Sequence, residues 1–204
     1  MEPTTGILNE DHQIILRMLK ILNQSINRFE KGEYVSTKIF DKTIDFIHFY
    51  IEKYHSKTEE DIVFKMLKER DSLFDKGLIK KLAMEHKLAR NYIFKFEKAV
   101  NHFKLGNESA RNKIIENARK FSLLISHHIH QENEVFNQMA DHILSLDDQN
   151  LLSKMLEKKR KEWGDDVYYK YNEMVEEMER EYWHSEPNIY FERLDKAEIS
   201  QVAP

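Results

Sequence analysis

Residues 54–64 read YHSKTEEDIVF, and residues 127–136 read HHIHQENEVF. Each stretch contains a histidine that is followed four positions later by a glutamate, namely His55 with Glu59 and His128 with Glu132. Residues four apart lie on the same face of an α-helix, about 6 Å apart along its axis. An imidazole and a carboxylate with this spacing can bind one metal ion together, so both stretches are predicted to be metal-binding helices.

A lone histidine beside an acidic residue precedes each pair in the chain. His12 lies in the stretch NEDHQIILRML, and His86 lies in the stretch AMEHKLARNYI. His12 comes 43 residues before His55, and His86 comes 42 residues before His128, so one hairpin pattern occurs twice in nearly the same register. In a bundle of four antiparallel helices, these residues would point inward at a similar depth.

Six residues of this duplicated pattern are predicted to bind metal. Two of them are carboxylates, and burying a carboxylate beside apolar side chains costs several kcal/mol unless a positive charge compensates it. Two metal ions between the helices would remove this cost, and nitrogen and oxygen ligands without thiolate suit iron, manganese or zinc. Each ion would keep open coordination positions for water or a small molecule. The predicted ligands are His12, His55, Glu59, His86, His128 and Glu132.

Four further histidines near helix faces fit this pattern less well. His48 lies seven residues before His55, about 10 Å along the helix axis, which is too far for the same ion. This distance favours a buried hydrogen bond or a contact that supports a ligand. His127 is a candidate auxiliary ligand because it lies directly before His128. His102 and His130 are predicted to be on the surface.

The rest of the chain is typical of long amphipathic helices. Its 204 residues include only five Gly and three Pro, 33% are charged, and apolar residues recur at three- and four-residue spacing. We predict an all-α fold that forms one domain over residues 1–183, with the metal-binding bundle over 7–145. The expected helices span about 7–31, 37–70, 77–104, 109–145 and, on the outside of these four, 147–182. An irregular tail is expected over 184–204.

Composition excludes several classes of protein. The chain has no cysteine, which excludes disulfides, iron–sulfur clusters and thiolate zinc sites. The net charge of −4, with acidic and basic residues interspersed, does not favour a nucleic-acid partner. The sequence has no apolar segment at its N-terminus and no apolar stretch near 18 residues, so a cytoplasmic protein without membrane contact is expected.

Four stretches of the chain resemble the ligand-bearing helices of hemerythrin-like proteins with the HHE cation-binding domain. They are, in chain order, EDHQIILRMLKIL, HSKTEEDIVF, EHKLARNYI and HIHQENEVFNQMAD. The resemblance covers roughly residues 7–145, and the fifth segment is similar to the C-terminal helix common in the microbial branch of the family. It implies an antiparallel up-down four-helix bundle with an additional C-terminal helix.

The resemblance also implies how the ligands divide between two iron ions. His12 and His55 would bind one iron, and His86 and His128 would bind the other. The two glutamates, Glu59 and Glu132, would bridge the ions, with an oxo, hydroxo or water ligand between them. Zinc or manganese could take the place of iron.

Two positions depart from the oxygen-carrying members of that family. Those proteins have another histidine four residues after the third-helix ligand, where this chain has Arg90. Many members have a second histidine directly after the equivalent of His55, where this chain has Ser56. Fewer ligands leave the irons more open, which favours redox chemistry or sensing over oxygen storage. Arg90 could pair with a bridging carboxylate or an incoming anion, or it could reach the surface. Tyr54 is a candidate phenolic ligand.

The sequence thus predicts a non-haem di-iron protein that binds or reacts with dioxygen, nitric oxide or peroxide, and leaves open whether it has oxidase- or peroxidase-type turnover. One alternative is an iron or oxygen sensor, or an iron-storage protein, that acts through a protein partner bound at the tail. Another is a zinc or manganese hydrolase, although no general-base motif accompanies the ligands. The expected partner is a small diatomic ligand or peroxide, and the chain is expected to be a monomer or a homodimer.

Overall fold

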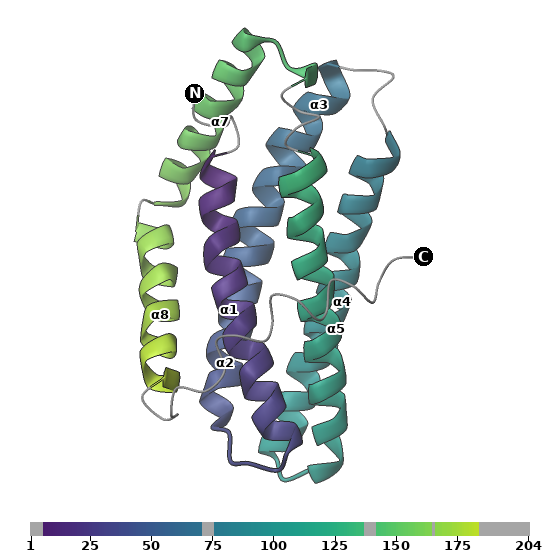
Figure 1. Cartoon of the computed structure of the whole chain (residues 1–204), viewed down its shortest axis with the longest axis vertical. Helices are drawn as coiled ribbons and strands as arrows, with labels where there is room; N and C mark the ends of the chain where they lie inside the picture. Colours follow the sequence, from purple (N-terminus) through teal and green to yellow (C-terminus); the bar gives the residue numbers. More distant parts are fainter. Residues whose placement is uncertain (1–5, 71–75, 137–141, 165, 184–204) are drawn as a thin grey trace.

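The computed structural model describes residues 6–70, 76–136, 142–164 and 166–183, and every regular element in these ranges is helical. Four long helical segments lie side by side and form a bundle (Figure 1). Helix α1 packs against α2 and α5, and α4 packs against the same two helices, so the four segments close around a shared interior. The predicted all-α helical fold is confirmed. The segments begin with α1 (Gly6–Glu30), α2 (Thr37–Phe46), α4 (Lys76–Lys104) and α5 (Arg111–Gln131).

The second and fourth segments change from α-helical to wider π-helical turns where the predicted ligands lie. The second segment runs through α2, η1 (Ile47–Ser56), η2 (Glu59–Val63) and α3 (Phe64–Arg70). After α5, which follows the short turn η3 (Glu108–Ala110), the fourth continues as η4 (Glu132–Phe136). The hydrogen bonds show the wider turn directly, because the Lys57 N–H donates to the Glu52 carbonyl, five residues back. Short π-helical turns such as η2 and η4 occur often at functional sites, whereas η1 is longer, at ten residues.

Two separate clusters of buried apolar residues fill the interior. The larger one contains Ile14 of α1, Tyr54 of η1, Ala89 of α4 and Ile129 of α5. The smaller one contains Leu8, Ile62 and Leu82 from the other end of the first three segments. Each fully buried Ile, Leu or Phe side chain stabilises the fold by about 1.5–3 kcal/mol. On the first three segments, the predicted ligands lie along the chain between members of the two clusters, so a polar layer separates two apolar cores. On α5, His128 lies between Ile125 and Ile129 of the larger cluster.

The predicted fifth helix is two helices in the structure, which corrects the expectation of a single element over 147–182. Helices α7 (Leu146–Trp163) and α8 (Asp166–Trp183) are separated at Gly164, whose φ of 92° is a conformation that residues with a side chain rarely adopt. Helix α7 contacts η2, and α8 contacts α1, so both lie on the outside of the bundle (Figure 1). Tyr171 and Met178 of α8 are buried there.

Two expectations fall partly outside the described residues. The fourth predicted helix was expected to reach residue 145, but residues 137–141 are not among those described, and Leu144 and Ser145 are not helical. The expected tail over 184–204 also lies outside the described residues. Within the described ranges, none of the helices combines the length and the apolar character needed to cross a membrane.

Candidate metal centre

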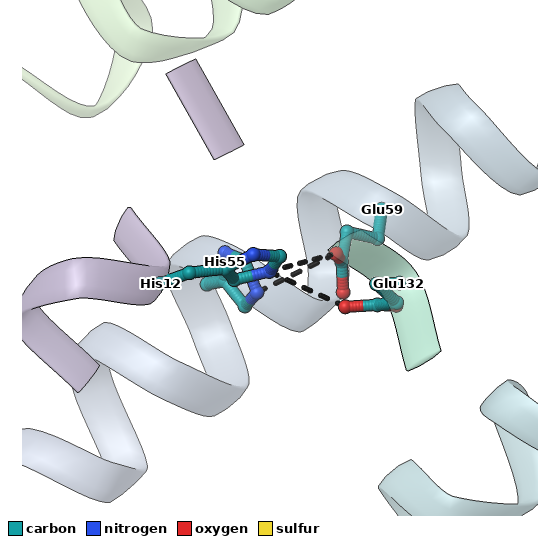
Figure 2. Close-up of side chains that lie close together, drawn as sticks. All are labelled: His12, His55, Glu59 and Glu132. Atoms are coloured by element: carbon teal, nitrogen blue, oxygen red, sulfur yellow. Dashed lines mark ion pairs between the residues drawn. The ribbon is translucent and has the colours of Figure 1, made fainter. Parts of the chain in front are cut away.

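The structure brings all six predicted ligands together in the polar layer between the two apolar cores. We refer to them as the six-residue cluster, and none of the six is more than 2% exposed. They come from all four segments of the bundle, and Figure 2 shows two imidazoles pointing toward the two carboxylates. The members are His12 on α1, His55 on η1, Glu59 on η2, His86 on α4, His128 on α5 and Glu132 on η4.

One half of the cluster is formed by His12 and His55 with one oxygen from each glutamate. The Nε2 atom of His12 lies 3.3 Å from Oε2 of Glu132, and the Nε2 atom of His55 lies 3.4 Å from Oε1 of Glu59. Oε1 of Glu59 also lies 3.9 Å from Nε2 of His12. Donor atoms of these four residues all lie within 4.8 Å of one another, which is close enough to surround one ion.

The other half uses the opposite oxygen of each glutamate. The Nε2 atom of His86 lies 3.4 Å from Oε2 of Glu59, and the Nε2 atom of His128 lies 3.2 Å from Oε1 of Glu132. These four residues also have donor atoms within 4.8 Å of one another. Each carboxylate therefore presents one oxygen to each pair of histidines, which is the geometry of a ligand shared by two ions.

Several buried nitrogen and oxygen atoms of the cluster have no hydrogen-bond partner in the described part of the chain, as expected of atoms that bind cations. Nε2 of His12, Nε2 of His55, Oε2 of Glu59 and both carboxylate oxygens of Glu132 have no hydrogen-bond partner among the described residues. Nearly all buried polar atoms in proteins have such a partner, because an unpaired one is costly. Cations between the histidines and the glutamates would satisfy all of these atoms at once. In the other half, Nε2 of His86 and Nε2 of His128 lie 3.0 Å apart in a hydrogen bond, so the unpaired atoms that face this pair are the carboxylate oxygens. The donor set of both halves, two imidazoles and two carboxylate oxygens each, fits a metal ion.

A second set of side chains orients the four imidazoles. An oxygen that accepts a hydrogen bond from Nδ1–H leaves the lone pair of Nε2 directed at the centre of the cluster. We refer to the four residues that supply these oxygens as the outer partners. Their contacts to the Nδ1 atoms are Asn133 to His12 at 2.8 Å, Asp11 to His55 at 3.5 Å, Glu60 to His86 at 2.9 Å and Glu85 to His128 at 2.8 Å.

Sequence reasoning assigned no role to the outer partners, although a signal was present. Each of them is the direct neighbour of a cluster residue in the chain. Adjacent residues on a helix point about 100° apart, so an outer partner does not reach the ligand beside it. It reaches a histidine on a neighbouring segment instead, which only the packing of the helices reveals.

Contacts between the imidazoles and the carboxylates of the cluster shift the pKa values of several members. Burial lowers the pKa of His12, but the carboxylates of Glu132 and Glu59 outweigh burial and raise that pKa to about 10. Burial also lowers the pKa of His128, and Glu132 and Glu85 reverse this and raise it to about 10. Burial raises the pKa of Glu59, but the neighbouring imidazoles lower it well below its ordinary value. His12 and His128 thus hold protons strongly unless metal ions replace them.

A family model described as the hemerythrin HHE cation binding domain matches residues 4–140. The match spans more than half of the 204-residue chain and contains the whole six-residue cluster. The chain belongs to the hemerythrin family. No curated protein and no solved structure matches it. As a hemerythrin HHE domain, it is a cation-binding domain, and its buried histidine–glutamate cluster contains the residues that could bind the cations.

Metal binding by this hemerythrin domain is expected to release protons and to strengthen as the pH rises. His12 and His128, with pKa values raised to about 10, hold protons at pH 7, and a metal ion needs the neutral Nε2 atom. Between pH 6 and 8, the apparent affinity is expected to rise by about tenfold for each pH unit and each proton displaced. Calorimetric titration in two buffers with different ionisation enthalpies measures the protons released. Identical binding enthalpies in the two buffers would contradict this expectation.

The structure places the remaining candidate residues of the hemerythrin domain away from the cluster centre. His48, expected to be buried, has a side chain that is 37% exposed, and its ring nitrogens contact Glu52 and Glu97 at 3.3 and 2.9 Å. The ring of Tyr54 packs against Tyr50 and Trp163 rather than among the ligands. The other histidines considered, which are His102, His127 and His130, are exposed.

Arg90 contacts an outer partner rather than a bridging carboxylate. Its guanidinium donates a hydrogen bond to Glu60 at 3.4 Å, and Glu60 in turn accepts the Nδ1–H of His86. Ser56, at the second departure from the oxygen-carrying pattern, is buried. Neither residue belongs to the six-residue cluster.

Proposed function

We propose that this hemerythrin-family chain is a non-haem di-iron protein that binds or reacts with dioxygen, nitric oxide or peroxide, built on the antiparallel four-helix bundle of its family. The observation that carries the proposal is the shared geometry of the two carboxylates. Glu59 and Glu132 each present one oxygen to the pair His12 and His55 and the other to the second pair of histidines.

The donor set supports iron over harder or softer cations. Imidazole nitrogens and carboxylate oxygens without thiolate suit iron, manganese and zinc, whereas magnesium and calcium prefer all-oxygen sites. Bound iron would supply a redox-active Lewis acid with open positions for a small ligand. Two glutamates offset only two of the four positive charges on two divalent ions. The cluster therefore favours an additional ligand that is anionic or that accepts negative charge, such as reduced dioxygen or peroxide.

The residues around the cluster limit the access of water. The cluster lies between two apolar cores, and the ring of Phe64 stacks on His86 with a centroid distance of 5.9 Å. A dry surrounding strengthens each electrostatic contact inside it. At the same time, Arg90 stands where the oxygen-carrying members have a further histidine ligand, and it contacts Glu60. This favours reaction or sensing over reversible oxygen storage.

An anaerobic titration tests the proposal. Protein without affinity-tag histidines is titrated with Fe(II), and two ions per chain are expected to bind. The loaded protein is then exposed separately to dioxygen, nitric oxide and hydrogen peroxide, and at least one of them is expected to produce new near-ultraviolet charge-transfer absorption. Zinc-loaded protein serves as the control, because zinc is redox-inactive. Fewer than two bound irons, or no spectral change with any of the three, would refute the proposal.

A further inference from the structure

Two of the outer partners, one in each hairpin, have the same position in the chain and contact the same kind of histidine. Asp11 directly precedes the lone histidine of the first hairpin, and Glu85 directly precedes that of the second. Asp11 accepts from the paired histidine of its own hairpin, His55, and Glu85 accepts from the paired histidine of its own, His128. This half of the outer set is anionic in both hairpins.

The other two outer partners repeat in position but not in charge. Glu60 directly follows one bridging glutamate, and Asn133 directly follows the other. Each accepts from the lone histidine of the opposite hairpin, which is His86 for Glu60 and His12 for Asn133. Asn133 therefore stands at the position that matches Glu60, and it replaces a carboxylate by a neutral amide.

A second difference concerns His12 and His55, whose Nδ1 atoms have weaker contacts to their outer partners than those of His86 and His128. The carboxylate of Asp11 lies 3.5 Å from Nδ1 of His55, and its other oxygen accepts a hydrogen bond from the phenol of Tyr50 at 2.7 Å. For the second pair of histidines, the carboxylates of Glu60 and Glu85 lie at 2.9 and 2.8 Å. The pair His86 and His128 thus has two short carboxylate contacts. The pair His12 and His55 has one amide contact and one long carboxylate contact that is shared with Tyr50.

This difference bears directly on metal affinity. A carboxylate that accepts the Nδ1–H bond raises the basicity of Nε2, whereas a neutral amide oxygen does so much less. Two cations lie near the carboxylates of the second pair: Arg90 at 3.4 Å from Glu60 and Lys81 at 3.9 Å from Glu85. Their side chains are 40% and 48% exposed, so water screens both charges. The second pair keeps the stronger donors.

We propose that the two iron sites have unequal affinity. The ion between His86 and His128 binds first and more tightly, and the ion between His12 and His55 binds second and exchanges more readily. Asn133 is the main positioning residue behind this difference, because it is the one neutral member of the outer set, and the long, shared contact of Asp11 adds to it. This inference rests on the proposed function, since it presumes that two ions bind.

The test is an anaerobic Fe(II) titration of wild-type protein and three variants, followed by calorimetry and by Mössbauer spectroscopy with one equivalent of ⁵⁷Fe. The wild type is expected to show two steps, with affinities at least about tenfold apart, and a single ⁵⁷Fe doublet after the first step. Asn133→Asp is expected to tighten the second step by about tenfold and to leave the first unchanged. Glu85→Gln is expected to weaken the first step by about 10–100-fold, so that ⁵⁷Fe divides between two doublets.

Glu134→Gln is the matched control, because Glu134 is exposed and lies directly after Asn133. It is expected to change neither step, and circular dichroism checks that every variant retains its helical content. Two steps of equal affinity in the wild type would overturn the inference and leave the di-iron proposal intact. Equal weakening of both steps in Glu85→Gln, with no effect of Asn133→Asp, would also overturn it. Failure to bind a second iron would instead refute the proposed function.

Discussion

Loading the protein with two equivalents of Fe(II) under anaerobic conditions is expected to raise its melting temperature by about 10 °C. The cluster exists only in the folded bundle, so bound ions stabilise the folded state alone. At a free metal concentration 1,000 times the Kd, binding contributes about 4 kcal/mol. In a chain of about 200 residues, each kcal/mol shifts the melting temperature by about 2–4 °C. Differential scanning calorimetry measures the shift.

Two controls separate this effect from unspecific binding. A chelator is expected to return the melting temperature to its starting value, and an equal concentration of Mg(II) is expected to leave it unchanged, since magnesium prefers all-oxygen ligands. A melting temperature that does not respond to iron, or that responds equally to magnesium, would argue against a metal centre in the cluster.

Replacing Glu132 by alanine is expected to weaken the binding of both ions by at least about 100-fold. Loss of a residue that only supports a ligand typically lowers metal affinity by 10–100-fold, and here a ligand is lost from both halves of the cluster. Its Oε2 atom lies 3.3 Å from Nε2 of His12, and its Oε1 atom lies 3.2 Å from Nε2 of His128. Equilibrium dialysis followed by iron analysis measures the remaining affinity.

A matched variant distinguishes loss of the centre from loss of the fold. Glu134→Ala makes the same change in charge two residues along the same helical turn, where the side chain is exposed, and it is expected to bind two ions normally. Glu132→Ala should keep its helical content, and its metal-free melting temperature is expected to fall at pH 7, because His12 and His128 lose the carboxylate that raises their pKa values. Helical content at the titration temperature therefore separates loss of metal binding from loss of the fold. If Glu132→Ala lost only one ion, the carboxylate would not be shared as proposed.

The arrangement of the cluster was predictable because helical periodicity carries most of the information. The four-residue spacing of His55 and Glu59 places both on one face, and the 43- and 42-residue separations align the two hairpins. That register implied that the six residues would meet, and the structure brings them together. Their role as metal ligands is a prediction that the experiments above test.

Other features depend on contacts between segments and could not be read from one helix at a time. Asn133 reaches His12 across 121 positions of the sequence, and the rotation of α1 against η4 decides that contact. The wide turns of η1, η2 and η4 also differ from the regular α-helices that the residue spacing predicted. The break at Gly164 did have a local signal, but the apolar stripe continues across it through Leu156 and Tyr171, which led to the prediction of one helix.

The polar layer between the two apolar cores divides the bundle into two ends. Hydrophobic contacts hold each end together, but at the level of His12, Glu59 and His86 the segments meet through polar groups that water could also satisfy. Ions bound there would link all four segments at the level of the polar layer. Folding of the two ends would then be coupled by metal occupancy, so a loaded chain should melt in one sharp calorimetric transition. A metal-free chain should melt over a broader range, because each end can loosen on its own.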